Sequence, residues 1–345
     1  MAHASTTLST PRQAPSEQAG ASLFVRAADG VRLHVKYVPS TGGPSGSPAG
    51  RGAVVLCHGL ASNGFAFDVP QRSLARFLAG RGYECFIPDL RGTGKSMVPS
   101  SGEWGLDDYL DLDLPAILQF VGERTESGPL YWIGHSMGGI LFMLYASDHP
   151  GVPVRRATAI ASSLDYRPGL SVYRFMAPVR PLWPRRLHVP FGLLSRVSAV
   201  AGSRGLPLPP ELINFQRSNL ELELRSAILN HGFGTIPKRL LDDLATSLSP
   251  GGLARRRGTH QYQSRLPAAR VPLQLIAGAG DLQCSVEAVD QTARMLDHLD
   301  ELRVHVFGKA YGHADDYGHF DLMVGRHAEH EVWPELVRWL NDDGS

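Results

Sequence analysis

Cysteine is scarce in this 345-residue chain, and both long apolar runs and a strong net charge are missing. The three cysteines, Cys57, Cys85 and Cys284, are scattered and form no C-x-x-C motif, so we expect no disulfide framework and a reducing, cytoplasmic compartment. No apolar stretch approaches the roughly 20 residues that a membrane-spanning helix needs, which argues against stable membrane insertion. The net charge of +1 creates no field that would attract nucleic acid.

The first 21 residues lack both the basic start and the apolar core of a signal peptide. We therefore expect residues 1–21 to form a disordered N-terminal tail. With 43% hydrophobic residues, the chain is long enough to bury a full core, either as one large domain with an insertion or as two small domains.

The most informative stretch is Gly-His-Ser-Met-Gly at residues 134–138, a G-x-S-x-G pattern. The apolar residues 130–133 before it predict a buried strand, and the residues after it suit a helix. A strand that turns into a helix at one residue strains the backbone of Ser136 and lifts its hydroxyl clear of the sheet. Only small residues fit two positions before and after that turn, where the chain has Gly134 and Gly138. The pattern predicts a serine that a base and a substrate can reach.

Strands and helices alternate along most of the chain. A hairpin is predicted over residues 22–38 around Asp29-Gly30, and further strands at residues 53–57, 84–89, 130–133, 156–162, 271–277 and 302–307. Helices are predicted over residues 67–82, 104–123 and 332–340. The alternation breaks at residues 164–268, which are rich in proline and arginine and contain helical pieces of their own. This order predicts an α/β core with an insertion.

The stretch at residues 134–138 resembles the nucleophile elbow of the α/β-hydrolase superfamily. Three more stretches are similar to that superfamily: His58-Gly59 after a strand, PDLRGTGKS at residues 88–96, and G-H-x-D-L at residues 318–322. The resemblance covers about residues 22–341. It implies an α/β-hydrolase fold with a mostly parallel central sheet flanked by helices. The implied domains are a first core part at residues 22–163, a helical cap or lid at residues 164–268 and a second core part at residues 269–345.

The resemblance also implies a catalytic set. Ser136 is expected to be the nucleophile and His319 the base, while Asp281 accepts the Nδ1–H of the histidine and stabilises the imidazolium. The backbone N–H groups of Leu60 and Met137 are expected to form an oxyanion hole. The chemistry needs all of these parts because the attacked ester carbonyl becomes an oxyanion.

Two of these assignments have alternatives in the sequence. His313 stands in a Tyr-Gly-His setting like that of His319, and Asp165 follows the strand at residues 156–162, where some relatives carry the acid. The loop after the strand at residues 84–89 resembles a phosphate-binding loop, but a Walker A motif needs glycine where this chain has Asp89. The aspartates of the helix at residues 104–123 are expected to be solvated rather than to bind a metal; they are Asp107, Asp108, Asp111 and Asp113.

The insertion contains large apolar residues, and we consider two roles for them. They either form an apolar underside of the cap over the active site or only attach the cap to the core. The residues are Phe175, Met176, Leu182, Trp183, Phe191, Leu193 and Leu194.

Taken together, these features predict a carboxylic ester hydrolase of the esterase or lipase type, which forms a covalent acyl-enzyme on Ser136. The expected partner is a small-molecule or lipid ester, and no cofactor or metal is expected. Transfer of the acyl group to an alcohol or amine on the same triad is one alternative. A non-catalytic, ligand-binding protein of the same fold is another, because fold does not determine function.

Overall fold

The structure is a computed structural model of the whole chain. It describes residues 20–42, 50–125, 128–176, 183–184, 187–256 and 261–342, with only the backbone of residues 175 and 176. The predicted N-terminal tail falls almost entirely outside these residues.

The core is one eight-stranded sheet with the order β1-β2-β4-β3-β5-β6-β9-β10. Its strands are β1 Ala21–Arg26, β2 Arg32–Val38, β3 Ala53–Cys57, β4 Glu84–Pro88, β5 Leu130–His135, β6 Arg156–Ile160, β9 Leu273–Gly278 and β10 Leu302–Phe307. The strand β2 runs antiparallel to β1 and β4, and all other neighbours are parallel. Every predicted core strand is present. The central strands β3 and β5 are buried along their whole length, as expected for strands covered on both faces.

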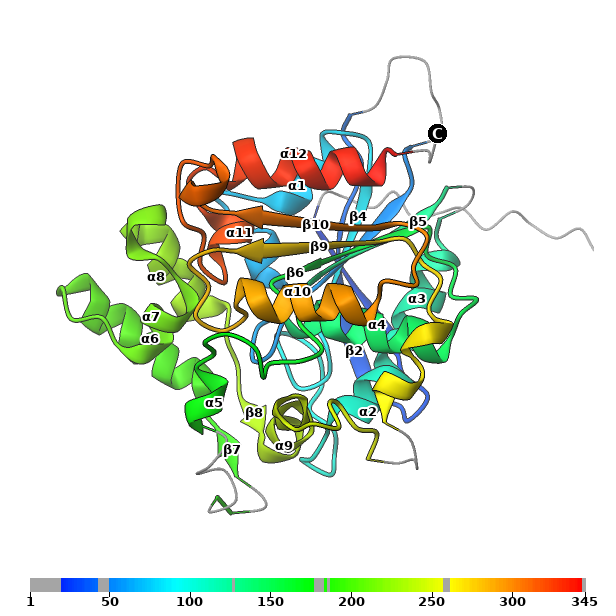
Figure 1. Cartoon of the computed structure of the whole chain (residues 1–345), viewed down its shortest axis with the longest axis horizontal. Helices are drawn as coiled ribbons and strands as arrows, with labels where there is room; N and C mark the ends of the chain where they lie inside the picture. Colours follow the sequence, from blue (N-terminus) through cyan, green and yellow to red (C-terminus); the bar gives the residue numbers. More distant parts are fainter. Residues whose placement is uncertain are drawn as a thin grey trace, which may run out of the picture.

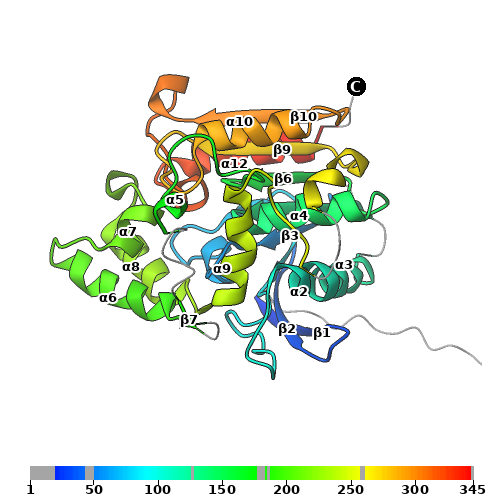
Figure 2. The ribbon, with the colours of Figure 1, turned by 60° about the horizontal axis from the view of Figure 1, so that its bottom comes forward.

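Helices cover both faces of the sheet (Figures 1 and 2). The helices α1 Leu74–Ala79 and α12 Ala328–Leu340 lie on one face, and α3 Leu114–Gly122, α4 Met137–Asp148 and α10 Val286–Met295 lie on the other. The helix α4, which follows the predicted reactive serine, is buried on nearly all sides. Ser136 therefore stands at the start of a helix that the core holds firmly.

Residues 164–268, called the inserted segment below, lie between β6 and β9. Its elements are α5 Tyr173–Met176, β7 His188–Val189, α6 Phe191–Ser203, α7 Pro209–Asn214, α8 Leu222–His231, β8 Ile236–Pro237 and α9 Lys238–Leu244. In Figure 1, α6, α7 and α8 lie beyond the end of the sheet to which β9 points, at its carboxyl edge. In open α/β sheets ligands bind at this edge.

The first predicted helix is shorter than expected. It was predicted over residues 67–82, but α1 begins at Leu74 and ends at Ala79. The hydroxyl of Ser73 accepts a hydrogen bond from the backbone N–H of Arg76 and so caps the helix start. Before it the chain makes a 3₁₀ turn at Gly64–Phe67 and passes through Pro70, which cannot donate a backbone hydrogen bond.

The helix predicted at residues 104–123 is divided into three pieces, and the expectation of solvated aspartates is wrong for three of the four. The pieces are α2 Leu106–Asp108, a π-helical stretch Tyr109–Asp113, and α3. Asp107, Asp108 and Asp113 are buried, and each has a partner. Asp107 accepts from the Tyr262 hydroxyl at 3.0 Å, Asp108 accepts from the Gly105 N–H at 2.8 Å, and Asp113 pairs with Arg91. These hydrogen bonds and the ion pair with Arg91 therefore compensate the burial of the three side chains.

The three cysteines are free and buried. Burial raises the pKa of the Cys57, Cys85 and Cys284 thiols, so they are held in the neutral form.

No helix in the described ranges has both the length and the apolar character to cross a bilayer. The described residues also contain no group of three or more His, Cys, Asp or Glu side chains arranged to hold a metal ion.

Candidate active site

Ser136 stands where β5 turns directly into α4. Its backbone angles, φ 54° and ψ −119°, are costly for a residue with a side chain. The Ser136 N–H donates to the Ile160 carbonyl at 2.8 Å, and the Ser162 hydroxyl donates to the Ser136 carbonyl at 2.8 Å. Hydrogen bonds from the neighbouring strand β6 and the loop after it therefore hold the strained turn in place.

Three glycines allow the chain to approach Ser136 closely. A Cβ atom on Gly134 would lie 2.3 Å from the Gly138 carbonyl carbon, and one on Gly138 would lie 2.2 Å from the Cys57 oxygen. A Cβ atom on Gly59 would lie 2.8 Å from the Ser136 Cβ. These distances are shorter than side-chain atoms tolerate, so close packing around the serine requires glycine at all three positions.

His319 and Asp281 form a buried pair at the same edge of the sheet. The Nδ1 atom of His319 lies 2.7 Å from Oδ2 of Asp281. A carboxylate only accepts, so Nδ1 carries the proton and Nε2 is left as an acceptor. The other oxygen of Asp281 accepts from the backbone N–H groups of Gln283 at 2.7 Å and Cys284 at 3.0 Å. The acid is thus fixed by its own loop as well as by the histidine.

His135 links the serine strand to the histidine loop. Its Nε2 donates to the backbone carbonyl of His319 at 3.0 Å, and the centres of the two rings are 4.7 Å apart. Burial and the nearby His319 hold the pKa of His135 well below its usual value, so the ring is neutral. The residue next to Ser136 therefore helps to position the backbone of His319.

Leu60 and Met137 border the same pocket as Ser136. Met137 is the first residue of α4, and the first N–H groups of a helix have no partner within it. Leu60 follows Gly59 in the loop after β3. The two residues expected to supply backbone donors therefore both line the pocket that contains Ser136.

The structure places the two alternative residues elsewhere. The ring of His313 packs on Phe307 with 4.6 Å between ring centres, and its Nδ1 contacts the backbone of Gly308. Asp165 accepts hydrogen bonds from the guanidinium and the N–H of Arg167. Burial raises the pKa of Asp165, but the bonds from Arg167 outweigh it and the pKa is lowered. The structure brings His319 and Asp281 together, and it brings neither His313 nor Asp165 into this pair.

A pocket joins these residues to the inserted segment. Ser136 and His319 line it from the core, and no Asp, Glu, Lys or Arg occurs among the described residues around it. Aliphatic and aromatic side chains form most of its wall, among them Ile140, Phe191, Ile213, Phe233, Leu241 and Leu248. The empty space inside the pocket, counted together with its open mouth, is about 1250 Å³.

The large apolar residues of the inserted segment do not all face this pocket. Trp183 and Phe191 line it, whereas Leu193 and Leu194 are 59% and 47% exposed on the outer face of α6. The expectation of an underside role is wrong for these two leucines, because α6 packs inward through its small residues. Those small residues are Gly192, Ser195, Ser198, Ala199 and Gly202. The side chains at 175, 176 and 182 lie outside the described residues.

Comparison with known sequences identifies the family of this chain. The model of the alpha/beta hydrolase fold family matches residues 52–187. Lipase member K from Mus musculus is 30% identical to this chain, over 91% of this chain and 86% of that protein. This chain belongs to the α/β-hydrolase superfamily. Gastric triacylglycerol lipase from Homo sapiens is 23% identical over the same shares of the two chains. Lipase member K from Homo sapiens is 33% identical, but that match covers only 34% of its length.

Solved structures confirm the α/β-hydrolase fold. A soluble variant of monoglyceride lipase from Saccharomyces cerevisiae superposes with a TM-score of 0.66 and 16% identity, covering 96% of this chain and 98% of that chain. An esterase from Exiguobacterium antarcticum gives a TM-score of 0.63 and 17% identity, covering 93% of this chain and all of that chain. The chain is therefore lipase- and esterase-like in family and fold.

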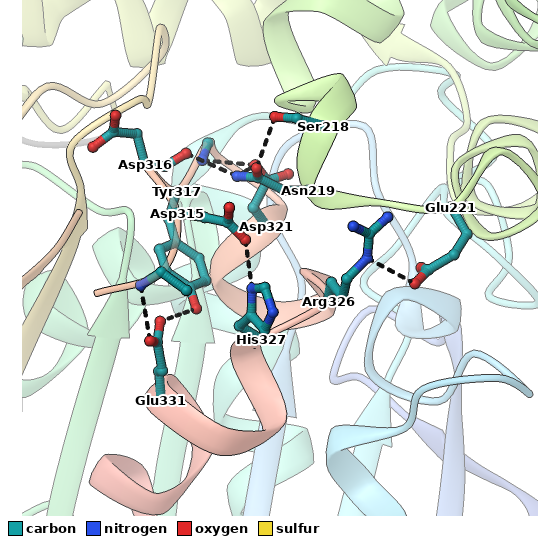
Figure 3. Close-up of polar contacts among 12 residues, drawn as sticks. Ser218, Asn219, Glu221, Asp315, Asp316, Tyr317, Asp321, Arg326, His327 and Glu331 are labelled. Atoms are coloured by element: carbon teal, nitrogen blue, oxygen red, sulfur yellow. Dashed lines mark hydrogen bonds and ion pairs between the residues drawn. The ribbon is translucent and has the colours of Figure 1, made fainter. Parts of the chain in front are cut away.

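A polar network beside the pair was not predicted from the sequence. Asp321, two residues after His319, accepts hydrogen bonds from the Gly318 N–H, from the Gln216 N–H and from Nδ2 of Asn219. Figure 3 shows Asn219 of the inserted segment beside Asp321 of this α/β hydrolase. The aspartate of the G-H-x-D-L stretch was the only sign of this network in the sequence. Two of its partners, Gln216 and Asn219, lie about a hundred residues earlier in the chain.

Proposed function

We propose that this lipase- or esterase-type serine hydrolase cleaves carboxylic esters with a triad of Ser136, His319 and Asp281. One observation carries the proposal: a strained serine and a histidine that is paired with a buried aspartate border one apolar pocket. Each part has a chemical role only in combination with the others, since a serine hydroxyl is a weak nucleophile without a base.

The proposed reaction proceeds through an acyl-enzyme. Nε2 of His319 takes the proton as the Ser136 oxygen attacks the ester carbonyl, and Asp281 stabilises the imidazolium that forms. The N–H groups of Leu60 and Met137 hold the oxyanion, and each such donor contributes about 3–4 kcal/mol to the transition state. The histidine then protonates the leaving alcohol. Water next attacks the acyl carbonyl while His319 takes its proton, and the histidine returns that proton to the Ser136 oxygen as the acid leaves.

The pocket supports an ester with an uncharged, apolar acyl chain as substrate. The described lining contains no Asp, Glu, Lys or Arg side chain, and His319 becomes charged only during the reaction. A charged acyl group would therefore lose its hydration without finding a partner in the pocket. Gastric triacylglycerol lipase and a monoglyceride lipase are among the similar proteins, which makes acylglycerols the first natural esters to test.

We further propose that the inserted segment acts as a cap over this site. Phe191, Ile213 and Leu241 belong to it and form part of the pocket wall together with residues of the core. An acyl chain bound there would be enclosed by both parts, and water would be excluded from the reacting carbonyl.

The free buried thiols support a reducing, cytoplasmic location.

The test is hydrolysis of p-nitrophenyl esters from acetate to palmitate by the parent enzyme and a Ser136→Ala variant. We expect the variant to lose at least about 10⁴-fold in kcat, because the nucleophile is gone while the pocket remains. A variant that hydrolyses these esters at the parent rate would contradict the proposal.

Two further measurements separate the alternatives. Product analysis with an added alcohol distinguishes hydrolysis from acyl transfer, since transfer yields a new ester instead of free acid. A fluorophosphonate probe labels an activated serine, so failure to label Ser136 would favour a ligand-binding protein without catalysis.

A further inference from the structure

One short stretch of the inserted segment, residues 213–219, contacts the loops of both proposed triad partners. On the acid side, the amide of Gln283 donates to the Ile213 carbonyl at 3.0 Å and to Oδ1 of Asn214 at 2.9 Å. Gln216 donates through its amide to the Gly280 carbonyl at 2.8 Å. Gly280 and Gln283 flank Asp281, so this stretch fixes the acid's loop on both sides.

The same stretch also holds the loop of the base. The N–H of Phe320, the residue after His319, donates to the Asn214 carbonyl at 3.0 Å. Nδ2 of Asn219 bonds the Asp316 carbonyl at 2.8 Å and Oδ2 of Asp321 at 2.9 Å. The Asn219 carbonyl accepts from the Arg326 N–H at 2.7 Å. Figure 3 shows Asn219 between Asp316 and Asp321.

Asp321 is where these contacts converge. One of its oxygens accepts three donors, from Gly318 at 2.9 Å, from the Gln216 backbone at 3.1 Å and from Asn219. Its side chain is fully buried, and its other oxygen has no partner among the described residues. A buried carboxyl group is costly unless its oxygens are bonded, and the donors to Oδ2 come from both the His319 loop and the inserted segment.

We infer that Asp321 is a positioning residue, which joins residues 213–219 of the inserted segment to the His319 loop and so sets the geometry of the His319–Asp281 pair. Asn219 is its partner across this junction. This inference rests on the proposed function, because a positioning role has meaning only if His319 is the base. The inserted segment then does more than cover the site, since it also aligns the base with the acid.

The position of the contacts distinguishes this role from that of a simple surface link. Of the two neighbours of His319, Gly318 donates to Asp321, which bonds the 213–219 stretch, and Phe320 donates to that stretch directly. A shift of the loop by even 1 Å would move Nε2 of His319 away from the serine, and errors of this size cost about 10²-fold in rate. Loss of the junction should therefore lower kcat while the apolar wall that binds the acyl chain stays in place.

The experiment compares four variants with the parent and with Ser136→Ala, using the full chain. Asp321→Ala removes the accepting oxygen, and Asp321→Asn keeps an oxygen in the same place without the charge. Asn219→Ala removes the donor from the inserted segment. Asp315→Asn is the matched control, because Asp315 lies on the same loop but pairs outward with His327 at 2.7 Å (Figure 3).

For p-nitrophenyl acetate, kcat is measured per serine titrated with a fluorophosphonate, together with KM and the melting temperature. We expect Asp321→Ala and Asn219→Ala to lower kcat by about 10- to 100-fold with a much smaller change in KM. Asp321→Asn should recover most of that loss, and Asp315→Asn should match the parent. A purely structural role would lower the melting temperature and the fraction of titratable sites without changing kcat per site.

The inference is overturned if Asp321→Ala and Asn219→Ala are folded and keep a kcat per site close to that of Asp315→Asn. It is also overturned if Asp321→Asn is as impaired as Asp321→Ala, since the accepting oxygen would then not matter. Should Asp321→Ala fail to fold, Asn219→Ala decides. A parent without activity, or an active Ser136→Ala, would instead refute the proposed function, and the inference would fall with it.

Discussion

The residues around Ser136 already predicted its strained backbone conformation. Its φ of 54° places it in a region that residues with a Cβ atom rarely adopt. The glycines at 134 and 138 were predicted to be necessary for the turn, and the short distances to their would-be Cβ atoms give the physical reason. The contact of Gly59 with Ser136 could not be predicted, because it depends on how the β3 loop packs against the elbow.

Asp321 gives a pH prediction at the residue scale. Burial raises its pKa to about 7, with a further rise from Asp281, although its three N–H donors favour the charged form. In the unfolded chain an aspartate has a pKa of about 3.9, so between about pH 4 and pH 7 only the native state keeps the proton. Stability then falls as pH rises through this window, by up to about 1.4 kcal/mol for each pH unit.

Asp321→Asn removes this titration. We expect the difference in free energy of unfolding between the variant and the parent to shift in favour of the variant from pH 4 to pH 7 and to stay constant above pH 7. Urea unfolding at pH 5 and pH 8 measures it, and Asp315→Asn serves as the control. An equal difference at both pH values would show that Asp321 keeps an ordinary pKa.

At the scale of elements, Arg91 connects three parts of the core that are distant in sequence. It follows β4, and its guanidinium bonds Asp113 of the π-helical stretch at 2.7 Å and Asp29 of the β1–β2 hairpin at 2.8 Å. Arg91 and Asp113 are both buried. The hairpin, the sheet and the helices after it are thus joined by one cation.

Arg91→Met should lower the free energy of unfolding by about 3–5 kcal/mol, because it leaves the Asp113 carboxylate buried without its cation. Chemical denaturation of the variant measures the loss. Arg26→Met is the control, since Arg26 belongs to the same hairpin but is exposed. A loss below about 1 kcal/mol, as for an exposed ion pair, would contradict a structural role of this buried contact.

At the scale of the whole molecule, the pocket exists only because the inserted segment packs against the carboxyl edge of the sheet. Ala245, directly after α9, lies in the pocket wall. Its small side chain leaves space that a bound acyl chain can occupy.

Ala245→Phe should therefore reduce kcat/KM for long-chain esters more than for acetate, by roughly 15-fold if about two methylene groups are displaced at about 0.8 kcal/mol per group. Rates with p-nitrophenyl acetate, octanoate and palmitate test this. Ala314→Phe, on an exposed loop outside the pocket, is the control. Equal losses for all chain lengths would mean that the acyl chain does not bind beside Ala245.

The sequence by itself determined the order of strands and helices, the turn at residues 134–138 and the position of the inserted segment. These follow from local periodicity and from the glycines that the close packing around the turn requires. Only the tertiary structure decided that Asp281 rather than Asp165 meets His319, that Asp107, Asp108 and Asp113 are buried, and that Asp321 reaches Asn219. The partner of a polar side chain depends on which loops pack together, and sequence spacing carries no record of that packing.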